Sequence, residues 1–217
     1  MPFLSIASRK FPPWLRFAAF AWLLFYIPTY WRYWGLANFL HLCDVAVLLT
    51  SIGILVNSPV LISSQAVSSL VIDALWLLDA AWRLILRRHP IGGTEYLFNE
   101  SYPLWLRLMS LFHIVLQVLL IWAIRQMGYD RRALLVQSAV TILLFLAACF
   151  TNPSENINFV FTAPIFNRQL GPAPVHVALS IGFLVCVVYY PTHLLLKKLF
   201  PLPTSFRSSG ETAERAG

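Results

Sequence analysis

The chain has 217 residues, of which 59% are hydrophobic and only 12% are charged, and its mean hydropathy is +0.69. This composition excludes an ordinary water-soluble domain, because a soluble fold of this size cannot hide so much apolar surface. The net charge of +7 does not indicate a nucleic-acid partner, since the basic residues are scattered at the ends of apolar segments. We therefore expect an all-α integral membrane protein surrounded by membrane lipids, with no nucleic acid bound.

Apolar segments follow one another along the whole chain. At roughly 20 residues per crossing, its length accommodates about six transmembrane helices. We expect one bundle over residues 1–200, with spans at about 14–34, 36–57, 60–86, 103–127, 133–150 and 175–200. The last residues, 201–217, are rich in Ser, Gly and charge, and we expect them to form a disordered cytoplasmic tail.

Individual residues mark the boundaries of these segments. The first segment follows Lys10 without a small-residue cleavage site, so we expect an uncleaved span, and its far end carries an aromatic belt. Residues 57–59 (Asn-Ser-Pro) join the second and third segments so tightly that these must be antiparallel neighbours. The fourth begins at Pro103, a long loop over 152–174 precedes the sixth, and Pro191 interrupts the sixth.

The basic residues predict the orientation, because Lys and Arg are retained preferentially on the cytoplasmic side. With the N-terminus inside, ten lie on the cytoplasmic side: Arg9, Lys10, Arg16, Arg125, Arg131, Arg132, Lys197, Lys198, Arg207 and Arg215. Six lie on the other side: Arg32, Arg83, Arg87, Arg88, Arg107 and Arg168. This bias predicts a multi-pass protein of the cytoplasmic (inner) membrane with both termini in the cytoplasm.

Ionisable side chains inside apolar segments are functional candidates, because each is costly in hydrocarbon unless it finds a partner. His41 and Asp44 lie three residues apart in the second segment, a spacing that places them on one helical face. Asp73 lies near the middle of the third segment, and Ser110 and His113 share a stripe of the fourth. The number of residues between each of these groups and the end of its segment gives its depth, and by this measure all of them lie in the same half of the membrane.

We therefore predict one polar cavity between the second, third and fourth segments, with residues 156–161 as its lid. A His paired with a carboxylate is oriented as a general base, whereas two His with one or two Asp could hold a divalent metal. A purely structural role, as hydrogen bonds between helices, is the alternative. The candidate catalytic residues are His41, Asp44, Asp73, Ser110 and His113.

Other polar residues have simpler interpretations. Asp79 and Arg83 lie four residues apart and are expected to neutralise each other. Cys43 is about 200° around a helix from His41, and the neighbouring Asp44 disfavours a thiolate, so we expect Cys43 to be a packing residue.

Five motifs together resemble a family of bacterial six-span membrane-associated proteins: residues 41–44 (HLCD), 110–113 (SLFH), 128–133 (GYDRRA), 156–161 (NINFVF) and 191–195 (PTHLL). The resemblance covers nearly the whole chain and implies a topology but no chemistry. The plan is also similar to that of the androgen-induced hydrolase family and related six-span lipid acyltransferases. That second resemblance implies Cys43 or Thr50 as a nucleophile toward fatty-acyl esters and His113 as the base, although Asp44 beside Cys43 departs from the pattern.

Two classes of function follow. The first is an intramembrane enzyme acting on a lipid or isoprenoid substrate, favoured by the one-sided polar residues. The second is a small-molecule or lipid carrier, or a non-catalytic binding or assembly partner, favoured if polar residues form a continuous path between the two faces. No nucleotide-binding glycine loop, HExxH, CxxC or Gly-x-Ser-x-Gly motif is present, so the sequence does not support a nucleotide-binding, zincin, thioredoxin-like or hydrolase-elbow interpretation, and it leaves the cofactor unknown.

Overall fold

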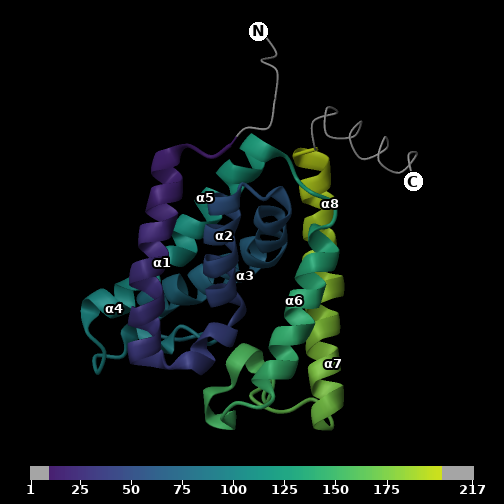
Figure 1. The fold of residues 1–217 in the computed structure, drawn as a ribbon. Coiled ribbons are helices and arrows are strands. Elements are labelled where there is room, and N and C mark those ends of the chain that lie inside the picture. Colours follow the sequence, from purple (N-terminus) through teal and green to yellow (C-terminus); the bar gives the residue numbers. More distant parts are fainter. Residues whose placement is uncertain (1–9, 202–217) are drawn as a thin grey trace.

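A computed structural model describes residues 10–201, and over these residues the chain is helical, with no β-strand (Figure 1). The α-helices are α1 (Pro13–Trp34), α2 (Leu42–Val56), α3 (Pro59–Leu86), α4 (Leu104–Met109), α5 (Phe112–Met127), α6 (Ala133–Ala148), α7 (Ala173–Phe183) and α8 (Tyr190–Leu199). Short 3₁₀ helices are η1 (Leu36–Leu40), η2 (Glu95–Phe98), η3 (Pro153–Glu155) and η4 (Ile157–Phe159), and a π-helical segment, η5 (Leu184–Tyr189), joins α7 to α8. The all-α expectation is confirmed for this part of the chain. Apart from Pro201, the tail expected over 201–217 lies outside the described residues, as do Arg9, Arg207 and Arg215.

Helix α3 runs through the middle of the bundle and carries most of the buried polar side chains. It contacts α2, α5 and α6, while α1 packs against α2, and α7 and α8 pack along α6 (Figure 1). Ser63, Gln65, Ser69 and Asp73 of α3 are buried inside the bundle, whereas Leu75 and Leu78 of the same helix are exposed.

A tight turn joins α2 to α3. Asn57 ends α2 in the left-handed conformation with φ 53°, and the Ser58 hydroxyl caps α3 by accepting a hydrogen bond from the Leu61 N–H at 3.4 Å. A Cβ added to Gly53 would lie only 3.0 Å from Ile62 Cδ1, so a glycine is needed for this close approach. The two helices are antiparallel neighbours, as the turn sequence predicts.

Three helices are long and apolar enough to cross a membrane: α3 with 28 residues, the α4–α5 pair (Leu104–Met127) with 24, and the α7–η5–α8 helix (Ala173–Leu199) with 27. Helices α2 and α6 are apolar but have only 15 and 16 residues. Helix α1 has 22 residues and is rich in Trp and Tyr. The expected segments are thus all largely helical, and three of them combine the length and the hydropathy of a membrane span.

Two expected helices are divided at candidate site residues. The segment expected over 36–57 is a 3₁₀ helix to Leu40, followed by an extended residue at His41 (φ −63°, ψ 137°), and only then by α2. The segment expected over 103–127 breaks between α4 and α5, at Ser110 and Leu111. Hydropathy averaged over a whole segment did not reveal these breaks, because single polar residues such as His41 and Ser110 hardly change the average.

The sixth segment continues through Pro191, where an interruption was expected. A proline lacks the N–H, and in a regular α-helix its ring clashes with the carbonyl one turn earlier. Here the preceding η5 is π-helical: the Tyr190 N–H bonds to the Val185 carbonyl, and this wider turn accommodates the ring. The proline therefore widens the helix locally instead of ending it.

The exterior of the described part of the chain is apolar. Large apolar side chains are exposed on the outer faces of the helices, among them Phe17, Phe20, Leu75, Val115, Val118, Leu135, Leu143, Leu179 and Phe183. The interior combines a hydrophobic core with buried polar side chains, among them Asp44, Gln65, Asp73, Asp79, His113, Gln137 and His176. An apolar exterior of this extent calls for an apolar environment.

Candidate functional site

Asp73 on α3 and His113 on α5 form a buried pair. His113 Nδ1 lies 3.0 Å from Asp73 Oδ1, and only 3% of the histidine and 1% of the aspartate are exposed. The imidazole is stacked between the rings of Trp76 and Phe112, each with its centroid 4.3 Å away. Because a carboxylate accepts hydrogen bonds, Nδ1 carries the proton and the lone pair of a neutral ring lies on Nε2. This is the arrangement of an oriented general base.

The second carboxylate oxygen of Asp73 has no partner. Oδ2 is buried and accepts no hydrogen bond from any described residue. An unsatisfied buried oxygen costs free energy, and an isolated one in a native structure calls for an explanation. A proton, a water molecule or a polar group of a ligand would satisfy it.

Asp44, in the first turn of α2, forms a second acidic centre. It accepts a short hydrogen bond from the Tyr26 hydroxyl of α1 and another, at 2.7 Å, from Asn38 Nδ2 of η1. The Tyr26 ring stacks on Tyr30 at 4.1 Å. A carboxylate is favourable at a helix N-terminus, where the backbone N–H groups point outward. Asp44 thus ties α1 and η1 to the start of α2.

The two acidic centres adjoin each other. The Phe112 ring connects them, because it stacks on His113 at 4.3 Å and lies 5.8 Å from the ring of Tyr26, which donates to Asp44. Ser110, at the break between α4 and α5, lies near the hydroxyls of Tyr30 and Tyr96. The structure therefore brings Asp44, Asp73, Ser110 and His113 into one region, which we call the acidic cluster.

His41 does not join the acidic cluster through a hydrogen bond. It occupies the N-cap position of α2 in an extended conformation, and its ring makes no hydrogen bond with any residue of 10–201. The expectation that His41 and Asp44 share a helical face is wrong, because the α-helix begins only at Leu42. Asp44 is instead paired with Tyr26 and Asn38.

Neither residue proposed as a nucleophile by resemblance is hydrogen-bonded to His113. Thr50 lies two turns farther along α2 than Cys43, and its hydroxyl is buried without a partner. Cys43 has two carboxylates in its neighbourhood, which oppose formation of a thiolate. The geometry thus favours proton transfer by His113 over attack by Cys43.

The acidic cluster is packed rather than open. Asp44, Asp73, Ser110 and His113 are each at most 3% exposed and are therefore shielded from the surroundings of the bundle. Two pockets, of about 230 and 160 Å³, lie at the opposite end of the bundle, and none of the candidate residues lines them. The predicted cavity is therefore closed in this structure, because aromatic rings from α1, α3 and α5 fill the space.

The metal alternative finds no support in the described residues. Within residues 10–201, no three His, Cys, Asp or Glu side chains come close enough to hold a metal ion. His41 does not join His113, and the bonds of Asp44 go to Tyr26 and Asn38.

The segment predicted as a lid is docked on the bundle. Asn158 Oδ1 accepts from the Leu42 N–H at 3.0 Å, and its Nδ2 donates to the Leu40 carbonyl at 2.7 Å, so this side chain bridges the break at His41. The Phe159 carbonyl accepts from His176 Nε2 at 3.0 Å. Residues 156–161 thus cap the start of α2, next to the acidic cluster. The contact between His176 and Phe159 was not predicted, because its acceptor is a backbone carbonyl, which residue types do not reveal.

Asp79 does not pair with Arg83. Its carboxylate accepts from the backbone N–H groups of Ile91 at 2.8 Å and Gly92 at 3.0 Å, and His89 Nδ1 lies 2.9 Å away. The Thr94 hydroxyl also donates a short hydrogen bond. Arg83 donates to the Arg87 carbonyl instead. Because the chain turns back in a left-handed conformation at Arg87, the following loop delivers all these donors to Asp79.

A separate polar network occupies the other half of the bundle. Gln65 of α3 donates to Gln137 of α6 at 3.2 Å, and the amide of Gln137 lies 3.5 Å from the Thr141 hydroxyl. Thr141 is bonded in turn to the Tyr189 hydroxyl at 2.8 Å. The two glutamines inside apolar segments were the signal that could have identified this network, since a buried amide needs partners.

The chain was compared with family models, curated protein sequences and solved structures, and none of them matches it.

Proposed function

We propose that the chain is an integral membrane protein that crosses the cytoplasmic membrane six times. The apolar exterior supports this placement, because exposed apolar residues cover the shorter helices as well: Leu135 and Leu143 of α6 are 76% and 67% exposed. Helix α2, with 15 residues, is about 22 Å long, and η1 extends it toward the ~30 Å thickness of the hydrocarbon layer.

In the proposed orientation, the end of the bundle that carries Arg125 faces the cytoplasm. Among the described residues this end has seven Lys or Arg: Lys10, Arg16, Arg125, Arg131, Arg132, Lys197 and Lys198. Cysteine labelling of intact cells tests it: a Cys at Ser154 should react with a membrane-impermeant maleimide and a Cys at Arg131 should not. The reverse pattern contradicts the orientation.

We propose further that the protein is an enzyme that acts on a lipid or isoprenoid substrate within the membrane. The observation that carries this proposal is the buried His113–Asp73 pair, in which Asp73 Oδ2 has no hydrogen-bond partner among the described residues. In this mechanism Nε2 removes a proton from water or from a lipid hydroxyl while the oxygen of that group attacks the carbonyl carbon of a lipid ester. Asp73 stabilises the imidazolium, and when the C–O bond of the ester breaks, the imidazolium gives the proton to the leaving alkoxide. A substrate that reaches this depth must be lipophilic, and it enters when the packed rings separate near the break at Ser110.

Comparison of lipids by mass spectrometry tests the proposal. A strain lacking the protein should accumulate one lipid species, and the wild-type gene should remove it. His113→Ala and Asp73→Asn should leave the species in place although the protein is present at normal levels in the membrane. His193→Ala is the matched control, because this buried histidine bonds Tyr129 in the other half of the bundle at 2.7 Å. Normal lipids in the His113→Ala strain contradict an enzyme that uses His113.

A carrier is the second candidate, and one observation favours it. The buried polar residues of α3 continue from Asp73 through Ser69 and Ser68 to Gln65, and so connect the acidic cluster to the glutamine network. A carrier needs groups in both halves of the bundle. In that case Gln137→Leu should abolish function as completely as His113→Ala, whereas the enzyme tolerates Gln137→Leu.

A further inference from the structure

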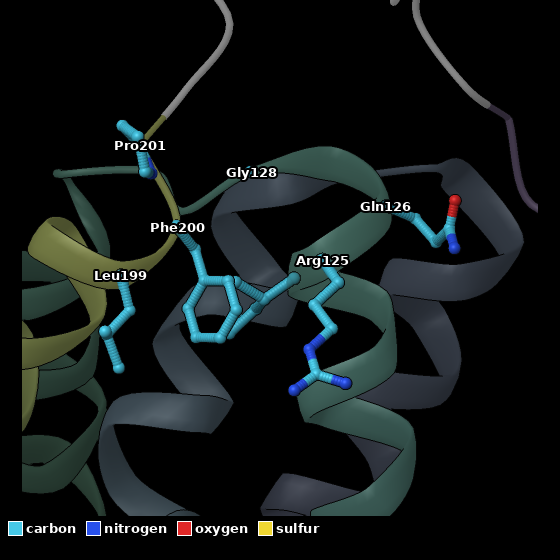
Figure 2. A pocket seen from close by; sticks show the side chains of 7 residues that line it. Arg125, Gln126, Gly128, Leu199, Phe200 and Pro201 are labelled. Atoms are coloured by element: carbon cyan, nitrogen blue, oxygen red, sulfur yellow. The ribbon is translucent and has the colours of Figure 1, made fainter. Parts of the chain in front are cut away.

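The larger pocket lies where α5 ends and the end of α8 passes beside it. Figure 2 shows Arg125 and Phe200 on facing sides of this hollow. The pocket has a volume of about 230 Å³ and is lined by Ile124, Arg125, Gln126, Gly128, Leu199, Phe200 and Pro201. It combines one cationic side chain with largely apolar walls.

Backbone hydrogen bonds hold the walls of this pocket in place. The Tyr129 N–H donates to the Phe200 carbonyl at 2.8 Å, which ties the end of α8 to the connector after α5. The Gly128 N–H closes α5 on the Ile124 carbonyl at 2.7 Å. The Tyr129 hydroxyl lies 2.7 Å from His193 Nδ1 of α8. The pocket is therefore preformed by contacts between segments far apart in the sequence.

Arg125 provides an uncompensated positive charge. Its side chain is exposed and makes no ion pair with any residue of 10–201. The single acidic residue among the described residues at this end, Asp130, is bonded to Arg132 at 2.7 Å. The pocket therefore attracts an anion.

A second, smaller hollow repeats this pattern beside the first. It has a volume of about 160 Å³ and is lined by Lys10, Phe11, Pro12, Trp122 and Gln126, so the two pockets share Gln126. The Phe11 and Trp122 rings pack at 5.8 Å. Each hollow thus pairs one cation with apolar walls at the same end of the helices.

We propose that the pocket beside Arg125 binds the headgroup of an anionic phospholipid. The inference rests on the proposed placement in the membrane, in which this pocket lies at the level of the headgroups. The guanidinium binds the phosphate, and the exposed side chain of Leu199 lies along the upper acyl chain. The apolar walls distinguish this ligand from a soluble phosphate, which gains nothing from them.

Native mass spectrometry of the full-length protein tests the proposal. The protein is released from nanodiscs of phosphatidylcholine that contain a minority of phosphatidylglycerol, and the retained lipids are counted. The wild-type protein should retain phosphatidylglycerol over phosphatidylcholine, and Arg125→Gln should lower this preference about fivefold. Arg131→Gln removes the same charge at the same end but outside the pocket, and it should keep the preference.

Each alternative outcome overturns the proposal. If Arg125→Gln and Arg131→Gln lower the preference for phosphatidylglycerol equally, only the general positive charge of this surface attracts the lipid. Equal retention of both lipids by the wild-type protein means that the pocket does not distinguish an anionic headgroup from a zwitterionic one. If inorganic phosphate at millimolar concentration displaces the lipid completely, the pocket is a site for a soluble anion. Recovery of folded protein in nanodiscs is scored separately and tests the membrane placement, while the lipid profile of His113→Ala tests the enzyme.

Discussion

Asp73 and Asp79 lie on the same helix and are both at most 1% exposed, but their surroundings differ. Asp79 accepts hydrogen bonds from two backbone N–H groups and the Thr94 hydroxyl, and His89 is within hydrogen-bonding distance. Asp73 has one partner, His113, and its other oxygen has none. The carboxylate of Asp79 is used completely in holding residues 87–95 against the end of α3. The carboxylate of Asp73 keeps a free oxygen for a proton or a ligand.

This comparison shows how a structural carboxylate differs from a functional candidate inside an apolar bundle. Burial alone does not separate the two aspartates, and neither does their position in an apolar segment. The two aspartates differ in the number of hydrogen-bond donors that the rest of the chain supplies to each carboxylate. A buried carboxylate with all its hydrogen bonds made has no capacity left for a substrate.

The substitution Asp73→Asn should have the largest effect, and it should act on activity. The amide oxygen can still accept from His113, so we expect the free energy of unfolding to change by about 1 kcal/mol or less. Turnover of the lipid found by mass spectrometry should fall about 100-fold, because an amide does not stabilise the imidazolium. The measurement pairs single-turnover assays with thermal unfolding in detergent. Full activity of Asp73→Asn would show that the Asp73 carboxylate is not needed for turnover.

The same substitution at Asp79 should act on stability. In Asp79→Asn an amide NH₂ replaces an oxygen that receives hydrogen bonds, so two donors face each other, and we expect a loss of about 2 kcal/mol in the free energy of unfolding. Thermal unfolding of the two Asn variants side by side measures the difference. A smaller loss at Asp79 than at Asp73 contradicts the structural role assigned here.

Asn158→Ala should have a smaller effect, confined to one end of the bundle. It removes the cap on the Leu42 N–H and the bond to the Leu40 carbonyl, and the loss of a helix cap costs about 1 kcal/mol. Hydrogen exchange should become faster at the first turn of α2 and in residues 156–161. Unchanged exchange there would show that the capping contact contributes no stability.

The substitution Asp130→Asn should have the smallest effect on the free energy of unfolding, and this effect should depend on pH. Burial raises the pKa of its carboxyl, but the hydrogen bonds and charge of Arg132 outweigh burial and leave the pKa below its ordinary value. A lowered pKa stabilises the folded state above about pH 4, and this contribution disappears as the pH falls through the folded-state pKa. Because Arg132 is 74% exposed, solvent screens the pair to about 0.5 kcal/mol. Wild type and Asp130→Asn should therefore differ in thermal unfolding at pH 7 and converge near pH 2.

Much of the candidate site was predictable from residue types. Asp73 and His113 were identified because an acid and an imidazole in apolar segments must find partners, and the two lie 3.0 Å apart. The placement of His41 on the helical face of Asp44 and the pairing of Asp79 with Arg83 were wrong for a common reason. Both assumed an unbroken regular helix, whereas the chain departs from it at His41 and at Arg87. Local turns of this kind depend on donors supplied from distant loops, such as Asn158.

A helical chain with an apolar exterior could be predicted from the runs of apolar residues and the turn residues between them. Which polar groups find hydrogen-bond partners depends on how the helices pack. Tyr26 reaches Asp44, Gln65 reaches Gln137 and Asn158 reaches Leu42 across 18, 72 and 116 residues. Hydrogen bonds require placement to within a fraction of an ångström, and that placement is set by the packing of whole helices rather than by local composition.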